Sequence, residues 1–429
     1  MTLEQANAWL ASRPAAFVQD LDAVRAVFAA LGCAESPVHF VGISGTAGKT
    51  AVAHMEAAIL NEAGFLTGLY TAGAGPLRAR LEIGGKPVEA RLYTRFAEKL
   101  AACPAAERLP RSAAELAVAC ACFTAAECMF AAVEFSDTLL AQLLPSMPVC
   151  AVTQIGDDGS GRSLERVAYS AASILRRDCT AVTTPSQPKA ALQEIIVAAG
   201  KADCELTVPE AEDLEQLAGR RLENHMDYGG YTVVLPQLGR PASENAAVAV
   251  ELALALWRKG FDIPDEPILA GLPAAPAGCG VHLLRRRPNI LAAPCRLPVQ
   301  AAALAVLLRE EGFSHLNVVA GLSGCPDAEA FFKALETGFI PEEDRTEKNQ
   351  MAGMSDNPVE KVYLVTPEGE NALDAQAAEQ AARFHFETEV CTDLASALAA
   401  ARDGGDGVVI LGGADICRQA DRLLNGKKK

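Results

Sequence analysis

Short apolar runs alternate with helical patterns along the first half of the chain. The run His39–Val41 precedes a glycine-rich turn, and residues 51–63 then carry apolar side chains at helical spacing. The alternation continues through apolar runs near residues 65–71, 128–135, 149–155 and 180–184. Strands that alternate with helices in this way pair in parallel, so the pattern predicts a doubly wound, mostly parallel α/β sheet.

A second βα series follows in the C-terminal part. Strands are expected at 289–294, 315–321, 361–366, 386–391 and 407–412. Residues 264–277 hold four prolines and are typical of a linker. We therefore predict an N-terminal domain at 1–283 and a smaller Rossmann-like α/β domain at 284–429. The polar stretch 341–357 has no periodicity, and we expect it to be a mobile surface insertion.

The turn after the first strand has the composition of a phosphate cradle. It reads Gly45-Thr46-Ala47-Gly48-Lys49-Thr50. Glycines let backbone N–H groups turn toward an anion, and the N-terminus of the next helix adds partial positive charge. Lys49 can reach the outer phosphates of a nucleotide, and Thr50 can offer its hydroxyl to Mg²⁺. Ile43 stands where a regular P-loop has its first glycine, so the alternative is a βα turn without a ligand.

Acidic residues follow two of the predicted strands. Glu134 closes the apolar run 128–135. The carboxyl end of a parallel strand beside a phosphate loop is where a ligand for Mg²⁺ belongs, although a solvent-facing acid is an equal alternative. Asp157 and Asp158 are also candidates for a metal, but the run Gly-Asp-Asp-Gly is more typical of a turn.

Composition limits the classes of function. Half of the 429 residues are hydrophobic and 21% are charged, as in globular proteins. No apolar run is long enough for a membrane helix and no signal peptide is evident, so we expect a cytoplasmic protein. The net charge is −16 and basic residues cluster only at 285–287 and 427–429, which argues against nucleic acid. The 13 cysteines lack paired spacing and are expected to be reduced and buried.

Together these features resemble the folylpolyglutamate synthase / dihydrofolate synthase family of the Mur ligase superfamily. The resemblance covers essentially the whole chain and depends on the order and spacing of its segments. These are two N-terminal helices ending at Leu31-Gly32, the loop 45–50, the strand 68–71, the hairpin 80–88, Glu134, residues 153–156, Gly239-Arg240, Glu244-Asn245-Ala246 and the C-terminal domain.

The resemblance implies an ATP-dependent, ADP-forming ligase. ATP activates a folate carboxylate as an acyl phosphate, which the amino group of glutamate then attacks. By resemblance, the P-loop ATPase domain holds ATP and Mg²⁺. The residues implied for these ligands are Gly45, Thr46, Ala47, Gly48, Lys49 and Thr50 for the phosphates, with Lys49 also catalytic, Thr50 and Glu134 for Mg²⁺, and Asn245 for the adenine. Relatives of this kind are monomers whose partners are small molecules.

Several positions depart from the pattern of the family. Gly159 stands where the family has a metal-binding histidine. The family's carbamylated lysine falls on or near Ala171, and the arginine of its linker falls near Cys279. The family's Asp-Gly-Ala-His-Asn-Pro falls on residues 293–298, which read Ala-Pro-Cys-Arg-Leu-Pro. Two alternatives to a ligase therefore stay open. One is a weak or inactive nucleotide-binding relative with a regulatory or scaffold role, and the other is an NTPase that drives a conformational change.

Overall fold

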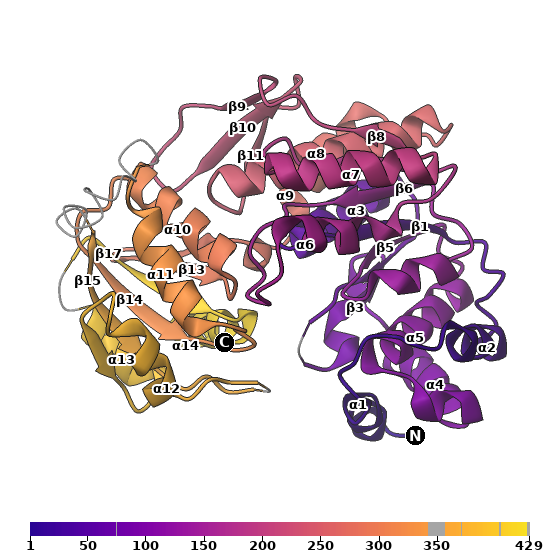
Figure 1. Ribbon diagram of the computed structural model, residues 1–429, viewed down its shortest axis with the longest axis horizontal. Coiled ribbons are helices and arrows are strands. Elements are labelled where there is room, and N and C mark those ends of the chain that lie inside the picture. Colours follow the sequence, from indigo (N-terminus) through magenta and orange to yellow (C-terminus); the bar gives the residue numbers. More distant parts are fainter. Residues whose placement is uncertain (74, 342–356, 370, 403–404, 427–429) are drawn as a thin grey trace.

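The computed structural model describes residues 1–73, 75–341, 357–369, 371–402 and 405–426. The insertion predicted at 341–357 falls almost wholly outside them. Figure 1 shows two units side by side, an N-terminal unit in indigo to pink and a C-terminal unit in orange and yellow. The sheet of the C-terminal unit begins at His282, beside the domain boundary at 283/284, which stays a prediction.

The N-terminal unit is built on an eight-stranded sheet with the order β4-β3-β2-β5-β1-β6-β7-β8. The strands are β1 (His39–Ser44), β2 (Thr67–Tyr70), β3 (Leu81–Ile83), β4 (Lys86–Pro87), β5 (Phe130–Glu134), β6 (Val149–Val152), β7 (Thr180–Thr183) and β8 (Glu205–Thr207). The run from β2 to β8 is parallel, whereas the β3–β4 hairpin adds to its edge antiparallel. The mostly parallel, doubly wound sheet predicted from the sequence is confirmed.

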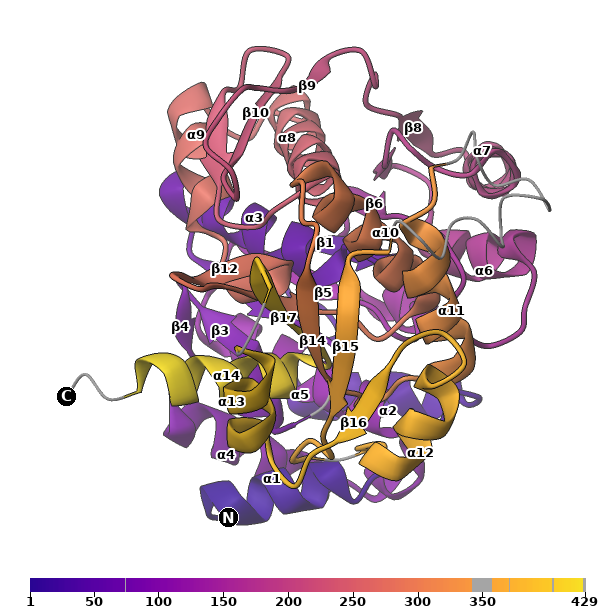
Figure 2. The same cartoon turned by 90° about the vertical axis from the view of Figure 1, so that its left-hand side faces the viewer.

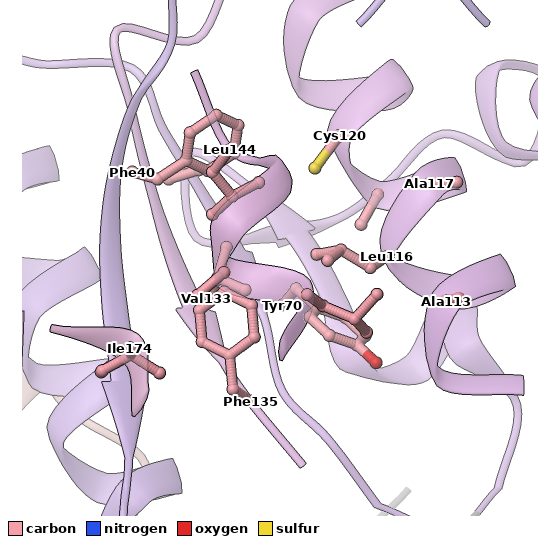
Figure 3. Packing of buried hydrophobic residues seen from close by; sticks show 14 of the residues in the cluster. Phe40, Tyr70, Ala113, Leu116, Ala117, Cys120, Val133, Phe135, Leu144 and Ile174 are labelled. Carbon is pink, nitrogen blue, oxygen red and sulfur yellow. The ribbon is translucent and has the colours of Figure 1, made fainter. Parts of the chain in front are cut away.

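Helices cover both faces of this sheet. One face carries α1 (Leu3–Ala11), α2 (Leu21–Leu31), α4 (Ala90–Ala101), α5 (Arg111–Ala125), α6 (Leu164–Ala171) and α7 (Lys189–Ala202). Figure 3 shows part of this core, where Leu116 and Ala117 of α5 face strand residues such as Phe40 and Val133. The other face carries α3 (Lys49–Glu62), α8 (Arg240–Arg258) and α9 (Asp265–Ala274). Strands buried on both faces explain their continuous apolar runs.

The stretch 264–277 is not a linker, which corrects the sequence-based prediction. Most of it forms α9, with Pro264 as its N-cap. Proline is tolerated there because the first turn of a helix has no internal acceptor for its N–H groups. Gly271 lets α9 approach α3 closely, since a Cβ there would lie 2.5 Å from the Cα of Ile59. The prolines are therefore part of a packed helix, with Pro264 at its start and Pro273 inside its last turn.

A small antiparallel sheet adjoins α8. Its strands are β9 (Leu214–Gln216), β10 (Asn224–Tyr228) and β11 (Val233–Leu235). None of the helices in the described residues is long and apolar enough to cross a membrane.

The C-terminal unit, which faces the viewer in Figure 2, has a six-stranded sheet with the order β12-β13-β17-β14-β15-β16. The strands are β12 (His282–Arg286), β13 (Asn289–Pro294), β14 (Leu316–Gly321), β15 (Val359–Leu364), β16 (Thr388–Val390) and β17 (Gly407–Gly412). The helices are α10 (Pro298–Glu310), α11 (Ala328–Gly338), α12 (Ala375–Ala382), α13 (Leu394–Ala401) and α14 (Ala414–Asn425). The five predicted strands are present and parallel, and β12 is an additional antiparallel edge strand.

Candidate functional site

A cleft of about 1090 Å³ lies between the two units. Its N-terminal wall contains residues 46–51, residues 70–73 and Glu134, and its C-terminal wall contains Arg296 and residues 412–415. These segments follow or end the parallel strands β1, β2, β5, β13 and β17. Ligands of open α/β sheets bind outside the carboxyl ends of the strands, so this cleft is the candidate site.

The turn from β1 to α3 is shaped by two glycines with positive φ. Gly45 has φ +126° and Gly48 has φ +89°, values that side chains other than glycine rarely adopt. A Cβ at Gly45 would overlap the hydroxyl of Thr153, and one at Gly48 would overlap the carboxamide oxygen of Asn245. Both glycines are therefore required by backbone geometry and by close neighbours.

The backbone amides of the turn divide into two groups. Those of Thr46 and Ala47 donate to the carbonyl oxygen of Gln154, each at 3.0 Å, and fix the turn against the segment after β6. The first turn of α3 begins at Lys49 at the cleft wall, and no side chain among the described residues caps it. Uncapped N–H groups at a helix start attract an anion, so these amides are the ones available to a phosphate.

Lys49 folds back over the turn. Its Nζ donates to the carbonyl oxygens of Gly45 at 2.8 Å and Thr46 at 3.2 Å. Burial lowers the pKa of the Lys49 ammonium, the negative charge of Glu134 opposes this shift, and the positive charge of Arg296 adds to it. A phosphate group would supply the counter-charge that the ammonium lacks at this place.

The side chains of Thr50 and Glu134 contact each other beside the turn. The Thr50 hydroxyl donates to Oε2 of Glu134 at 2.9 Å, and Glu134 is only 5% exposed. Burial raises the pKa of the Glu134 carboxyl group, and Lys49 and the hydrogen bond from Thr50 oppose that shift. A hydroxyl and a carboxylate are oxygen ligands of the kind that Mg²⁺ prefers, usually together with phosphate oxygens and water.

No group of three or more His, Cys, Asp or Glu side chains among the described residues could hold a metal ion by itself. The pair of Thr50 and Glu134 therefore fits a metal whose remaining ligands come from a bound nucleotide and water. Asp157 and Asp158 lie in a turn, where they accept from the backbone of Gly159 and from Arg162, respectively. Both acids thus have hydrogen-bond donors within their own segment.

Asn245 lies against the turn from the first part of α8, where its oxygen faces Gly48. Its neighbour Glu244 accepts from Arg240 at 3.0 Å and from Ser186 at 2.5 Å, which fixes this end of the helix. The structure thus brings Asn245 to the same turn as Lys49. A role for Asn245 at an adenine stays a prediction.

The positions that depart from the family pattern have other contacts. A Cβ at Gly159 would overlap Pro326 of the C-terminal unit. Ala171 is buried, and its carbonyl oxygen accepts from Ser44 at 2.8 Å. Cys279 lines the cleft, and burial, followed by the charges of Glu134 and Glu82, raises the pKa of its thiol to about 12. None of these three side chains supplies an oxygen or nitrogen ligand for a metal.

Three cleft features were not recognised from the sequence. His54 lies one helical turn after Thr50, a spacing that was a usable signal, and burial lowers the pKa of its imidazole to about 4. Arg296 reaches the cleft from the C-terminal unit. Glu115 accepts from Arg80 at 2.7 Å and from Arg111 at 2.9 Å in the cleft wall. The last two features are assembled by tertiary structure.

No protein-family model and no curated protein sequence matches the chain. Solved structures do match it over its length. Folylpolyglutamate synthase of Mycobacterium tuberculosis complexed with ADP is 23% identical with a TM-score of 0.80, and the match covers 99% of this chain and 98% of that one. E. coli FolC in complex with DHPP and ADP is 18% identical with a TM-score of 0.80, covering 100% and 99%.

A third match is the bifunctional folylpolyglutamate synthase/dihydrofolate synthase of Yersinia pestis complexed with AMPPNP and Mn ion. It is 21% identical with a TM-score of 0.77, and the match covers 99% of this chain and 98% of that one. The likeness extends across both units, so it includes their arrangement around the cleft. The chain therefore has the two-domain fold of the folylpolyglutamate synthases.

Proposed function

We propose that the chain is an ATP-dependent, ADP-forming ligase that joins a carboxylic acid to an amine, of the folylpolyglutamate synthase type. The observation that carries this proposal is the Thr50–Glu134 pair beside Lys49, at the start of a helix whose first residues line the cleft. Phosphoryl transfer needs these parts, namely amides and a lysine for the phosphates and a metal site next to them.

Each group has a defined part in the proposed reaction. Lys49 and the first amides of α3 bind the outer phosphates of ATP, while Thr50 and Glu134 would hold Mg²⁺, which would supply positive charge beside the phosphoryl group. A substrate carboxylate oxygen bonds to the terminal phosphorus, and the bond from that phosphorus to ADP breaks. The amine nitrogen then bonds to the acyl carbon, phosphate leaves, and the nitrogen loses a proton to water.

The solved structures support the choice of ligands. Proteins of this fold are described with ADP, with AMPPNP and Mn ion, with DHPP, and with L-glutamate. We extend these ligand classes to this chain as ATP, a divalent metal such as Mg²⁺, a folate and glutamate. Asn245 is proposed to contact the adenine, and the protein is proposed to act as a cytoplasmic monomer.

A second candidate function is nucleotide binding without efficient ligation. It is favoured by Gly159 and Ala171, because neither side chain can ligate the second metal that the resemblance implies. A missing metal-centred charge removes several kcal/mol of transition-state stabilisation, which slows a reaction by orders of magnitude. Such a protein would keep the fold and the phosphate turn and act through its nucleotide-bound form.

One assay separates these functions. Purified protein is incubated with ATP, Mg²⁺, a reduced folate and glutamate, and the release of ADP is followed. ADP release that needs both folate and glutamate supports the ligase, and release that needs neither supports an NTPase. Bound ATP without ADP release supports the inactive relative. Lys49→Ala is expected to weaken ATP binding, whereas Lys189→Ala, at an exposed lysine of α7, serves as the control.

A further inference from the structure

The geometry points to Arg296 as a phosphate-binding residue that the C-terminal unit contributes to the nucleotide held by the turn of the N-terminal unit. This inference deepens the proposed function and rests on its nucleotide site. Arg296 lies between β13 and α10, at the carboxyl end of β13. It lines the same cleft as Lys49, Thr50 and Glu134.

The position of Arg296 is fixed by its neighbours. Its backbone N–H and that of Leu297 both donate to Oε1 of Gln300, at 3.0 and 3.2 Å, which holds the turn at the start of α10. Its Nη1 donates to the carbonyl oxygen of Gly324 at 3.1 Å. The side chain is thus anchored at one nitrogen atom.

The rest of the guanidinium group is available to a ligand. Among the described residues, Arg296 has no acidic partner, and its Nε and Nη2 make no hydrogen bond to protein. The residue is exposed to the cleft although the chain as a whole carries a charge of −16. A planar group with several free donors matches the oxygens of a phosphate.

The charges next to the turn after β1 also favour an anion. Arg296 and Lys49 are both positive, the start of α3 adds partial positive charge, and the acid that acts on both cations is Glu134. The two cations lie close enough for their charges to repel each other across the cleft. A bound polyphosphate would remove this repulsion between two cations.

The terminal phosphate is the part of a nucleotide that Arg296 is expected to contact. The turn after β1 belongs to the N-terminal wall, so the phosphates nearest to it are bound by Lys49 and the helix amides. We place the terminal phosphate where Lys49 on one wall of the cleft and Arg296 on the other can both bind it. Arg296 would therefore select a nucleoside triphosphate over a diphosphate and supply fixed charge near the transferred group.

Binding measurements test the inference without reference to catalysis. The affinities of AMPPNP and ADP are measured by calorimetry with Mg²⁺ for the full-length protein and its variants. Arg296→Ala is expected to weaken AMPPNP by about 10- to 100-fold, the range for a charged hydrogen bond, and to leave ADP almost unchanged. Arg296→Lys should recover part of the loss, because it keeps the charge and lacks the fork.

Lys333→Ala is the matched control, since Lys333 is an exposed cation of α11 that does not line the cleft. It should leave both affinities unchanged. The inference is overturned if Arg296→Ala changes the affinities for AMPPNP and ADP equally. It is also overturned if Arg296→Ala changes neither affinity while Lys49→Ala weakens both. If the unaltered protein binds neither nucleotide, the proposed function fails as well. Arg296→Gln provides a second substitution should the alanine variant not fold.

Discussion

The hydroxyl of Thr50 donates a 2.9 Å hydrogen bond to the carboxylate of Glu134, although 84 residues separate them in the chain. The register of the sheet explains the meeting. β5 pairs in parallel with β1, and Glu134 lies opposite Ile43, immediately before the turn that leads to Thr50. A strand-end acid and a helix-start hydroxyl are thus brought to one point by the order of two neighbouring strands.

Replacing Glu134 by Gln tests this pair as a metal site. Glutamine still accepts the hydrogen bond from Thr50, so the fold should persist, but it is a poorer ligand for Mg²⁺. In the unaltered protein Mg²⁺ should strengthen the binding of AMPPNP. In the Glu134→Gln variant we expect this gain in affinity to be smaller by at least about tenfold. Calorimetry with and without Mg²⁺ measures this. Glu82→Gln, at a half-buried acid of β3, is the control, and equal Mg²⁺ effects in both variants would contradict the assignment.

Gly48→Ala tests the close contact between the turn and Asn245. Gly48 and Gly64 have similar φ values, +89° and +86°, but only a Cβ at Gly48 would overlap a neighbour. Gly64→Ala should therefore cost only the backbone strain, about 1–2 kcal/mol in the free energy of unfolding. Gly48→Ala should cost more and should also weaken nucleotide binding. Urea unfolding and calorimetry measure both effects, and equal behaviour of the two variants would refute the contact.

Glu56 predicts a pH dependence of stability. This residue of α3 is completely buried, neither carboxylate oxygen has a partner in the described structure, and burial raises its pKa to about 8. Between its ordinary value of 4.5 and about 8, the folded state holds a proton that the unfolded state releases. Stability should therefore fall as the pH rises through this window and level off above about 8.

Glu56→Gln should remove that part of the slope. Above pH 8 the variant should exceed the unaltered protein by a few kcal/mol in the free energy of unfolding, on the order expected for such a pKa shift. Urea unfolding at intervals between pH 5 and pH 8.5 measures the difference. Glu62→Gln, at an exposed acid of the same helix, should change nothing. Parallel curves for Glu56→Gln and the unaltered protein would exclude a buried charge.

Glu115→Ala should destabilise the wall of the cleft. Glu115 is 4% exposed and accepts from Arg80, Arg111 and the hydroxyl of Tyr70. Removing the acid leaves two arginines without their shared counter-charge, which typically lowers the free energy of unfolding by about 3–5 kcal/mol. Asp22→Ala breaks the exposed ion pair with Arg25 and should change the free energy of unfolding by no more than about 1 kcal/mol. A similar small change in both variants would show that the buried cluster carries no stability.

The sequence predicted the local parts of the site better than the contacts between parts that lie far apart in the chain. The spacing of glycines, Lys49 and Thr50 between a strand and a helix is local, and the structure has that local arrangement. Glu134 was predicted at a strand end, but only the β5–β1 pairing puts it beside Thr50. Arg296 follows a strand of a different sheet, so its approach to Lys49 depends on how the two units pack, which no local pattern encodes.

For the helix α9 the prediction from sequence was wrong. Four prolines suggested a linker, and their composition outweighed the apolar spacing of Ile268 and Leu272, both fully buried against the first sheet. Position within the helix decides whether proline breaks it, and Pro264 and Pro267 lie where no helical N–H is needed. The edge strand β12 was missed because charged residues dominate its C-terminal half.

Gly156 and Gly159 set how near the two units can come to each other. A Cβ at Gly156 would lie 2.5 Å from Cγ2 of Val299 on α10, and one at Gly159 would overlap Pro326. The same segment holds the phosphate turn through the carbonyl oxygen of Gln154. Larger residues at these glycines would act as spacers that widen the cleft. Gly156 and Gly159 thus permit the close approach of Val299 and Pro326 to the segment that holds the phosphate turn.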